Sequence, residues 1–304
     1  MIPLPPFDPA TTPRWIAAAA GALPELNQVS LEQDMALVAE VLGPGGRLLF
    51  GAGPGSPTVQ VLAPPTERDP VIALLGDLFA PRGSRDVRYR ETRLSHAEPA
   101  SADRVLAAVD HALAGGPEPL LLYLGGHGEL GDEPRHNTVS LWAQSALTVA
   151  DLAAHLDQSP RPVRLVVTTC FSGGFAELVF REANPALGES PTERCGLFAA
   201  PWDLEATGCD PNPDRAAQEG YGLHLLEALR GRDRHGEPLP ADTLDLDGDG
   251  RISLLEAHTR ARIASTSADV PTSTAERWLR HAAPEQGPQQ EVALPEEDAL
   301  IEAL

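Results

Sequence analysis

Two apolar runs, each ending in a reactive side chain, decide how this chain folds: Leu120-Leu-Leu-Tyr-Leu-Gly-Gly-His-Gly-Glu129 and Val163-Arg-Leu-Val-Val-Thr-Thr-Cys-Phe-Ser-Gly-Gly174. Short, continuous apolar runs of this kind are typical of strands buried inside a parallel sheet. Parallel strands end at a common edge, where α/β proteins gather their chemistry. We therefore expect His127 and Cys170 at one edge, where an imidazole beside a thiol can form a cysteine nucleophile.

Strand and helix patterns alternate along the chain around these two runs. We expect strands at 47–51, 87–92, 119–125, 163–169 and 195–200, and helices at Pro13–Gly21, 30–42, 70–80, 101–114, 148–157, 173–183 and 220–231. Strands separated by helical stretches predict the α/β class, with a mostly parallel sheet between two helical layers, an αβα sandwich.

Pro238 and Pro240 mark a boundary late in the chain, and they complete the expected domain organisation. It consists of an N-terminal helical segment (1–45), a main domain (46–235), an acidic loop with one helix (236–282) and an acidic tail (283–304). The composition of the tail predicts disorder.

The composition limits the partners and the cellular setting. The 304 residues include 44 acidic and 23 basic side chains, which give a net charge of −21. That charge disfavours nucleic acids and anionic membrane surfaces as partners. Three cysteines do not make a disulfide framework, and no signal core or membrane-spanning run is visible. We expect a cytoplasmic protein.

The chemistry expected at the sheet edge is that of a cysteine nucleophile. His127 would take the proton of Cys170 and return it to the leaving amine, while the N–H groups of Gly128 and Cys170 hold the oxyanion. A helix starting just after Cys170 would lower the pKa of its thiol. One alternative is that both residues are structural. Another makes Ser172 the nucleophile, although its surroundings lack the first glycine of a G-x-S-x-G elbow.

These motifs resemble those of the caspase–legumain–metacaspase clan of cysteine peptidases (clan CD). Gly126-His-Gly-Glu129 is similar to the histidine motif of caspases and metacaspases, and Cys170-Phe-Ser-Gly173 to the metacaspase cysteine motif. The resemblance covers about residues 46–232. It implies a caspase-like fold and a cysteine endopeptidase with a Cys-His dyad and no obligatory third acid. It also implies protein substrates and a role in bacterial defence or regulated cell death.

The same resemblance bears on specificity, with one departure from the clan's pattern. Thr168-Thr169 stands where caspases have Gln-Ala and where metacaspases often have an Asp two positions before the cysteine. The segment Pro201-Trp-Asp-Leu-Glu205 is similar to a Trp-Asp stretch of separase-like proteases. The resemblance makes Asp203, beside Trp202, the acid that meets an arginine before the scissile bond (P1). Glu205 and Asp132 are weaker candidates, and a solvated acidic loop is the alternative.

A polar segment between residues 180 and 195 lies where caspases are cut into two subunits. Arg181 and Arg194 are therefore candidate processing sites, for the enzyme itself or for an upstream activating protease. An ordinary surface loop is the alternative.

A second motif, Asp245-Leu-Asp-Gly-Asp-Gly-Arg-Ile-Ser-Leu-Leu-Glu256, matches the EF-hand calcium loop. Its expected ligands are side chains at loop positions 1, 3, 5, 9 and 12 and a backbone carbonyl at position 7, which correspond to Asp245, Asp247, Asp249, Ser253, Glu256 and Arg251. The loop predicts Ca²⁺ binding. Metacaspases are often calcium-dependent, so the resemblance implies activation by Ca²⁺, with a purely structural site as the alternative.

Two other functions remain open at this point. One is a calcium-binding interaction protein on a catalytically idle caspase-like fold. The other is a serine or thioester hydrolase on a different α/β fold.

Overall fold

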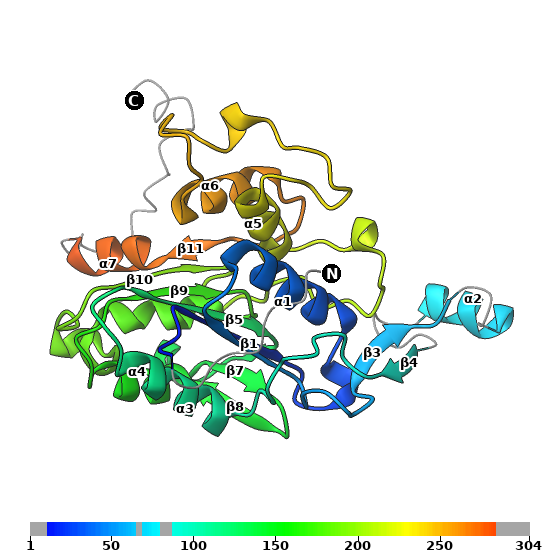
Figure 1. The fold of residues 1–304 in the computed structure, drawn as a ribbon, viewed down its shortest axis with the longest axis horizontal. Helices are drawn as coiled ribbons and strands as arrows, with labels where there is room; N and C mark the ends of the chain where they lie inside the picture. Colours follow the sequence, from blue (N-terminus) through cyan, green and yellow to red (C-terminus); the bar gives the residue numbers. More distant parts are fainter. Residues whose placement is uncertain (1–10, 65–68, 80–86, 284–304) are drawn as a thin grey trace, which may run out of the picture.

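A six-stranded, mostly parallel sheet forms the centre of the molecule (Figure 1). The computed structural model describes residues 11–64, 69–79 and 87–283. The strand order across the central sheet is β11-β10-β9-β5-β1-β2. The strands are β1 (Trp15–Ala20), β2 (Gly46–Phe50), β3 (Val59–Leu62), β4 (Val87–Arg90), β5 (Leu120–Gly126), β6 (Gly128–Glu129), β7 (Thr138–Leu141), β8 (Ser145–Thr148), β9 (Val163–Val167), β10 (Arg194–Phe198) and β11 (Thr272–Ser273).

Helices pack on both faces of this sheet. The α-helices are α1 (Val29–Leu42), α2 (Pro70–Phe79), α3 (Ala102–Leu113), α4 (Val149–Leu156), α5 (Tyr221–Arg230), α6 (Leu254–Ala264) and α7 (Thr274–Ala282). Short 3-10 turns are η1 (Pro24–Leu26), η3 (Pro134–His136), η4 (Ser172–Val179), η5 (Arg181–Ala183), η6 (Pro185–Leu187), η7 (Arg215–Ala217) and η8 (Ala241–Thr243).

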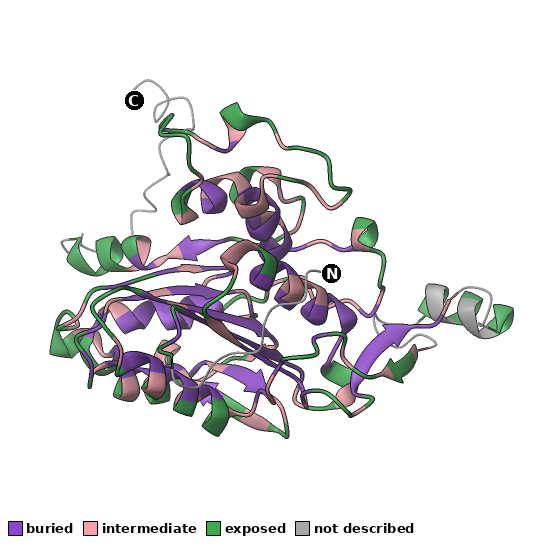
Figure 2. Cartoon of the chain, in the orientation of Figure 1, coloured by how far each residue is buried: buried purple, intermediate pink, exposed green. Residues whose placement is uncertain are grey.

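Two apolar clusters, one on each face of the sheet, form the core (Figure 2). Alternate residues of β1 divide between them, because successive side chains of a strand point to opposite faces. Ile16 and Ala18 join the cluster that includes α3 and α4. Trp15 and Ala17 join the cluster that includes α1, α5 and α6. The predicted α/β class with helices on both faces of a mostly parallel sheet is confirmed.

The expected helix at Pro13–Gly21 was wrong, because this segment contains β1. Its alanines favour a helix in isolation. In the folded chain Trp15–Ala20 is buried along its whole length and pairs in parallel with both β2 and β5. Tertiary pairing therefore overrides local propensity, and the first 45 residues supply a central strand rather than a separate helical segment.

Two further departures concern the segments around the sheet. β4 pairs with β3 in a separate two-stranded antiparallel sheet, not with the central sheet. The helix expected at 173–183 is the 3-10 run η4, which follows Phe171 in the left-handed region with φ of 57°. A side chain at Gly173 would come within 2.7 Å of the backbone at Pro201, so this turn packs tightly against the chain after β10.

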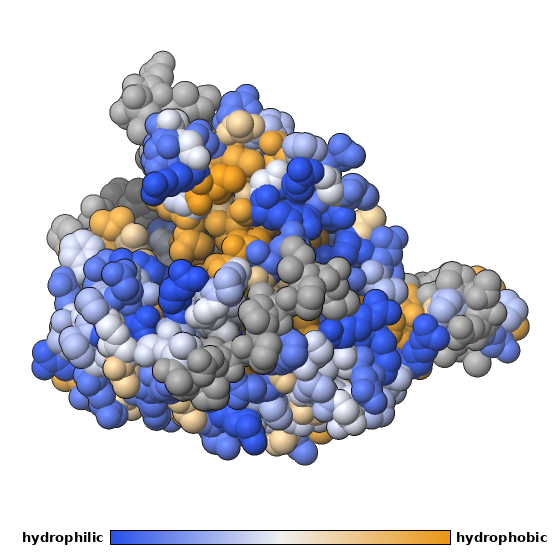
Figure 3. All heavy atoms as spheres, viewed as in Figure 1, coloured by the Kyte–Doolittle hydropathy of each residue, from blue (hydrophilic) through white to orange (hydrophobic). Residues whose placement is uncertain are grey.

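The C-terminal part returns to the main body. β11 pairs antiparallel with β10, and α6 buries Ala257 and Ala261 in the cluster that contains α5. Apolar side chains remain visible on the surface near α1 and α5 (Figure 3). No helix in the described part of the chain is both long and apolar enough to cross a membrane. The tail predicted to be disordered lies, apart from residue 283, outside the described residues.

Candidate active site

The sheet brings His127 and Cys170 to the same edge. β5 and β9 are parallel neighbours, and Leu124 is the register partner of Val167. The N–H of Thr168 continues this ladder by donating to Leu124 O at 2.9 Å. Continued three residues past Leu124 and Val167, the same register places His127 opposite Cys170. Neighbouring strands are about 4.8 Å apart. The two side chains that the sequence predicts to work together therefore leave adjacent strands at equivalent positions.

Gly128 shows how closely the two segments approach. A Cβ added at Gly128 would lie 2.1 Å from Cys170 O and 3.0 Å from Thr169 Oγ1. Only glycine fits here without displacing the backbone of the nucleophile. β6 pairs Gly128 with Val139, and the adjacent hydrogen bond of the ladder runs from Ser140 N to His127 O. Gly128 and Val139 are therefore a non-hydrogen-bonded pair of the antiparallel ladder. In such a pair the Gly128 N–H is not used by the ladder, so it is free for an oxyanion.

The imidazole of His127 is held by its Nε2 atom. Leu26 O lies 3.0 Å and Gln28 Oε1 2.9 Å from Nε2. A carbonyl oxygen can only accept, so Nε2 must carry the proton and Nδ1 keeps its lone pair. Burial lowers the pKa of His127, and the Leu26 carbonyl partly offsets this effect. The imidazole is therefore neutral at neutral pH and can act as a base.

The thiol of Cys170 lies against the loop that follows β10. Ala206 N donates to Sγ at 3.3 Å, and Sγ lies 3.4 Å from Ala206 O. Burial raises the pKa of Cys170, the Ala206 N–H opposes this, and the charges of Glu205 and Asp269 raise it further. The expected lowering of this pKa by a following helix was wrong, because the acidic, buried surroundings prevail. Both shifts favour the uncharged forms, a thiol at Cys170 and a neutral imidazole at His127.

A pocket opens beside Cys170. Gly126 and Thr168 line it from the sheet edge, Asp34 lines it from α1, and residues between 206 and 223 complete the wall. Arg215 Nη2 pairs with Asp34 Oδ1 at 2.8 Å. Burial raises the pKa of Asp34, and Arg215 opposes that effect. Asp34 is a site residue that the sequence reasoning missed, since only the fold brings α1 beside β5.

Asn137 is a second residue that sequence reasoning missed. It is fully buried, and its Nδ2 donates to Phe171 O at 2.9 Å and to Trp202 O at 2.6 Å. Its Oδ1 accepts from Gly131 N at 2.9 Å. One amide therefore ties the loop after His127 to the loop after Cys170 and to the loop after β10. No motif marks this asparagine in the sequence.

The substrate-binding residues predicted from the sequence lie apart from this pocket. Trp202 and Asp203 are exposed on the loop after β10, and Asp132 is exposed and pairs with His136 at 2.6 Å. None of the three lines the pocket beside Cys170 in the described part of the chain. The carboxylates that do line it are Asp34 and Glu219.

The two predicted processing sites differ in their surroundings. Arg181 is exposed at the start of η5. Arg194 is buried at the start of β10, where its backbone pairs with Val163 and its guanidinium pairs with Asp157. A protease needs an exposed, extended segment, so cleavage at Arg194 is incompatible with this folded chain, and that expectation was wrong.

The acidic loop brings three of its predicted ligands together. Oxygens of Asp245, Asp247 and Asp249 all lie within 4.8 Å of one another. Asp245 Oδ2 accepts from Gly250 N at 2.9 Å, whereas Asp245 Oδ1 is buried without a hydrogen-bond partner. An unsatisfied buried carboxylate oxygen beside two other carboxylates fits a hard cation.

The remaining predicted ligands are at the end of the same loop. Glu256 Oε1 accepts from Leu246 N at 2.6 Å and Oε2 from Ser253 N at 2.7 Å, so its carboxylate faces the loop backbone. Ser253 Oγ caps α6 by accepting from Glu256 N, and Arg251 is exposed. The short turn η8 stands where an EF-hand has its incoming helix, directly after Pro238 and Pro240.

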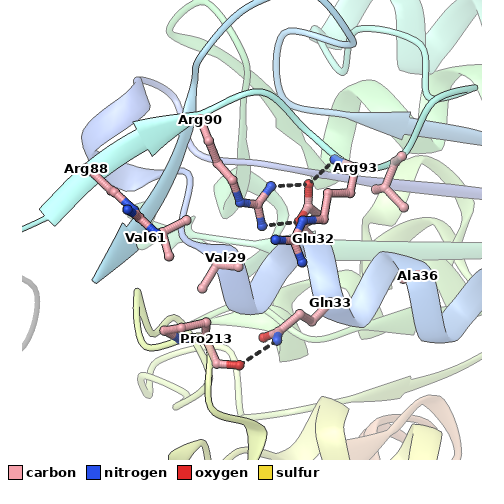
Figure 4. A pocket seen from close by; sticks show the side chains of 10 residues that line it. Val29, Glu32, Gln33, Ala36, Val61, Arg88, Arg90, Arg93 and Pro213 are labelled. Atoms are coloured by element: carbon pink, nitrogen blue, oxygen red, sulfur yellow. Dashed lines mark hydrogen bonds and ion pairs between the residues drawn. The ribbon is translucent and has the colours of Figure 1, made fainter. Parts of the chain in front are cut away.

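A second pocket, of about 260 Å³, lies beside the first turns of α1 (Figure 4). Glu32 is buried there and binds Arg90 through both oxygens, at 3.1 and 2.6 Å. It also accepts from Thr92 Oγ1 at 2.7 Å and from Arg93 N at 2.6 Å. These bonds anchor the start of α1 to the end of β4 and to the segment that follows it.

Comparison with known proteins gives a limited result. The sequence matches no protein-family model and no curated protein sequence. Similar solved structures include a Geobacter sulfurreducens protein, with 14% identity over 86% of this chain and 92% of that chain and a TM-score of 0.45. Caspase-1 from Spodoptera frugiperda shows 13% identity over 76% of this chain and 77% of that chain, with a TM-score of 0.38. A secreted C11 cysteine protease from Bacteroides thetaiotaomicron shows 10% identity over 75% of this chain and 60% of that chain, with a TM-score of 0.34.

Proposed function

We propose that this protein is a caspase-like cysteine endopeptidase that acts on protein substrates through Cys170 and His127. The observation that carries the proposal is that the two residues follow the ends of adjacent parallel strands, where Gly128 packs directly against the backbone of Cys170, with Nε2 of His127 held by two acceptors. The order of the following elements supports it. A strand (β10), a long loop and a helix (α5) follow the cysteine, as the resemblance to caspases implies.

The reaction follows from the resting state of the dyad. Cys170 Sγ attacks the substrate carbonyl as Nδ1 of His127 takes its proton, because both groups start neutral. The C–S bond forms, and the oxyanion accepts from the N–H groups of Gly128 and Cys170. The C–N bond then breaks as His127 returns the proton to the leaving amine. Water, activated by the same imidazole, hydrolyses the thioester and restores the thiol.

We place a basic side chain before the scissile bond, on electrostatic grounds. Four carboxylates act on Cys170 or line the pocket beside it, from Asp34, Glu205, Glu219 and Asp269. Arg215 is the one guanidinium among the described lining residues. Such a surrounding favours a cation in the pocket and disfavours an acidic P1 residue. Asp34 lines this pocket and Asp203 does not, so we assign the P1 contact to Asp34; the pocket, of about 20 Å³, must open and the bond from Arg215 must yield for an arginine to enter.

Calcium dependence is the second part of the proposal. Bound Ca²⁺ would neutralise the carboxylates of Asp245, Asp247 and Asp249, with Glu256, Ser253 and the carbonyl of Arg251 as further ligands. The loop ends in α6, and the segment after α6 contacts the loop over Cys170. Ordering of the calcium loop by Ca²⁺ would therefore also fix the position of the loop over Cys170.

The contacts between these two segments are specific. Asp269 accepts from Thr207 N at 2.8 Å and from Thr207 Oγ1 at 3.0 Å, next to the Ala206 that bonds the sulfur. Glu219 of the pocket accepts from Ser265 Oγ and Thr266 N, both at 3.1 Å. Loosening the calcium loop would therefore loosen the wall of the pocket.

Cleavage of a peptide panel that varies only at P1 tests the whole proposal. Wild type is expected to cleave after Arg, to lose activity in EGTA and to be inactive as Cys170→Ala. Preference for Asp or Asn would remove the acidic pocket from the account. Cleavage unaffected by EGTA would leave calcium a structural role. A wild type that cleaves nothing while still binding Ca²⁺ would favour the idle, calcium-binding interaction protein.

The physiological setting is proposed from the sequence resemblance alone. It comprises a cytoplasmic location, activation by the protein itself or an upstream protease at Arg181, and a bacterial defence or cell-death pathway. Mass spectrometry of incubated wild type beside Cys170→Ala tests the processing step. An active chain that stays intact would remove it.

A further inference from the structure

The start of α1 forms a fixed platform beside the candidate dyad. Gln28, the residue before α1, is only 7% exposed. Its neighbour Asn27 is fully buried and bonds Gly21 N, Thr58 O and Gln60 N through its side chain and backbone. One turn further on, Glu32 anchors α1 through four hydrogen bonds, and Figure 4 shows those from Arg90 and Arg93. A side chain from this platform therefore has a defined position.

The Gln28 side chain is directed at the imidazole. Its Oε1 lies 2.9 Å from His127 Nε2, the atom that also donates to Leu26 O. The backbone carbonyl fixes the proton on Nε2, which obliges the glutamine to present its oxygen and not its NH₂ group. Two acceptors from the turn before α1 thus converge on one ring nitrogen, and described residues give Nδ1 no hydrogen bond.

We propose that Gln28 is a positioning residue for His127, whose amide oxygen holds the imidazole plane so that Nδ1 faces Cys170. This inference rests on the proposed peptidase function for its catalytic consequence. A single acceptor leaves the ring free to swing about the Nε2–H direction, whereas a second acceptor from another direction restricts that motion. The glutamine takes the place that an acid has in three-membered catalytic sites, but it adds no charge.

The absence of charge matters for the base. Burial keeps the pKa of His127 low. A carboxylate at position 28 would stabilise the imidazolium and raise that pKa, whereas an amide leaves the ring neutral. Gln28 therefore combines orientation with a free base at neutral pH.

Three variants separate positioning from simple stability. Gln28→Leu removes the acceptor, and Gln28→Glu keeps an acceptor of the same reach but adds a charge. Gln60→Leu is the matched control. Gln60 is also a buried glutamine, with 4% of its surface exposed, and its backbone pairs with that of Gln28 in an isolated parallel β-bridge. Thermal melting of all three variants measures how much stability is lost when a buried glutamine is replaced at position 28 or at position 60.

The kinetic expectation for Gln28→Leu is a fall in kcat/KM of about 10- to 100-fold, mainly in kcat, since misplacing a catalytic group by about 1 Å costs up to about 10²-fold. Leu26 O still fixes the tautomer, so the loss stays below that of a wrong tautomer. Gln60→Leu is expected to keep wild-type kcat. Equal kcat losses in the two leucine variants would overturn the proposal.

Gln28→Glu supplies a readout that a structural role would not move. The acid limb of kcat/KM against pH should shift to higher pH by about one unit or more, because the base must be deprotonated and its pKa rises. Activity above that limb should be retained. An unshifted limb would contradict the contact with His127.

Imidazole ¹⁵N NMR keeps this test independent of the proposed function. Wild type should show the Nε2–H tautomer of His127, assigned by its loss in His127→Gln, and Gln28→Glu should raise its pKa. If wild type cleaves no peptide but these shifts occur, the peptidase proposal fails and the contact stands. An unchanged titration in Gln28→Glu would overturn the role of Gln28 whether or not peptides are cleaved.

Discussion

Replacement of Gly128 by alanine is the substitution whose consequence the structure defines most sharply. The added Cβ would lie 2.1 Å from Cys170 O and 3.1 Å from Cys170 C. Ordinary van der Waals contact begins at 3.4 Å, so the backbone of Gly128 or Cys170 must move by more than 1 Å. Both are backbone segments at the ends of packed strands, and neither can yield like a flexible side chain.

Two effects should follow from this displacement. Overpacking at a tight site costs about 1–3 kcal/mol, which for a chain of this size lowers Tm by a few degrees. Moving the oxyanion donor and the nucleophile by about 1 Å should lower kcat/KM by about 10²-fold or more. A 10²-fold loss corresponds to about 2.7 kcal/mol of transition-state stabilisation, so catalysis should lose at least as much free energy as folding does, because the collision is at the reacting atoms.

The assay is hydrolysis of a fluorogenic Arg peptide together with a thermal melt. Gly116→Ala is the matched control, since a Cβ at Gly116 meets nothing within 4 Å and the residue has no positive φ. This control should match wild type in both measurements. If Gly128→Ala cleaved as fast as Gly116→Ala, the close approach of the two segments, and with it the site as described, would be refuted.

Four other outcomes are expected. Asp269→Asn should weaken the hold on Thr207 and lower kcat/KM more than Asp203→Asn does, and equal values would remove the link from α6 to the pocket. Asp34→Asn should reduce the preference for Arg over neutral P1 residues at least tenfold, and an unchanged preference would remove Asp34 from P1 selection. Calcium should raise the Tm of wild type and of Asp242→Asn but not of Asp245→Asn, and a rise in all three would place the ion elsewhere. Burial and nearby carboxylates raise the pKa of Cys170, so iodoacetamide should alkylate it more slowly than a free thiol at pH 8. The alkylation rate should still increase above pH 9. A rate that reaches its plateau below pH 8 would mean that Cys170 is a thiolate at rest.

The sequence predicts the sheet edge well because the two runs that carry His127 and Cys170 are mostly apolar. Buried parallel strands have this pattern, and the glycines that follow them mark the turn into the site. The spacing of the acidic loop predicts a cation site, and the structure brings Asp245, Asp247 and Asp249 within 4.8 Å of one another; binding of the ion stays a prediction. These features are local, so they can be read without the fold.

The rest depends on pairing between distant segments. β1 consists largely of alanine, and only its position between β2 and β5 makes it a strand. Asp34 and Gln28 belong to an unremarkable helix and the turn before it, and Asn137 lies in a loop without a motif. The roles of Asp34 and Gln28 arise because the fold brings α1 and the turn before it to the end of β5, and that of Asn137 because three loops meet around its amide. The raised pKa of Cys170 likewise depends first on its burial and then on the charges of Glu205 and Asp269, which no spacing connects to the cysteine.

The central claim is that Cys170 and His127 react as a pair. A peptidyl acyloxymethyl ketone with Arg at P1, followed by intact-protein and peptide mass spectrometry, tests this most directly in wild type, His127→Gln and the surface control His155→Gln. We expect one adduct, on Cys170, with a rate about 10²-fold or more lower in His127→Gln and unchanged in His155→Gln. Modification of Cys195 or Cys209 instead, or an equal rate in His127→Gln and wild type, would contradict the account.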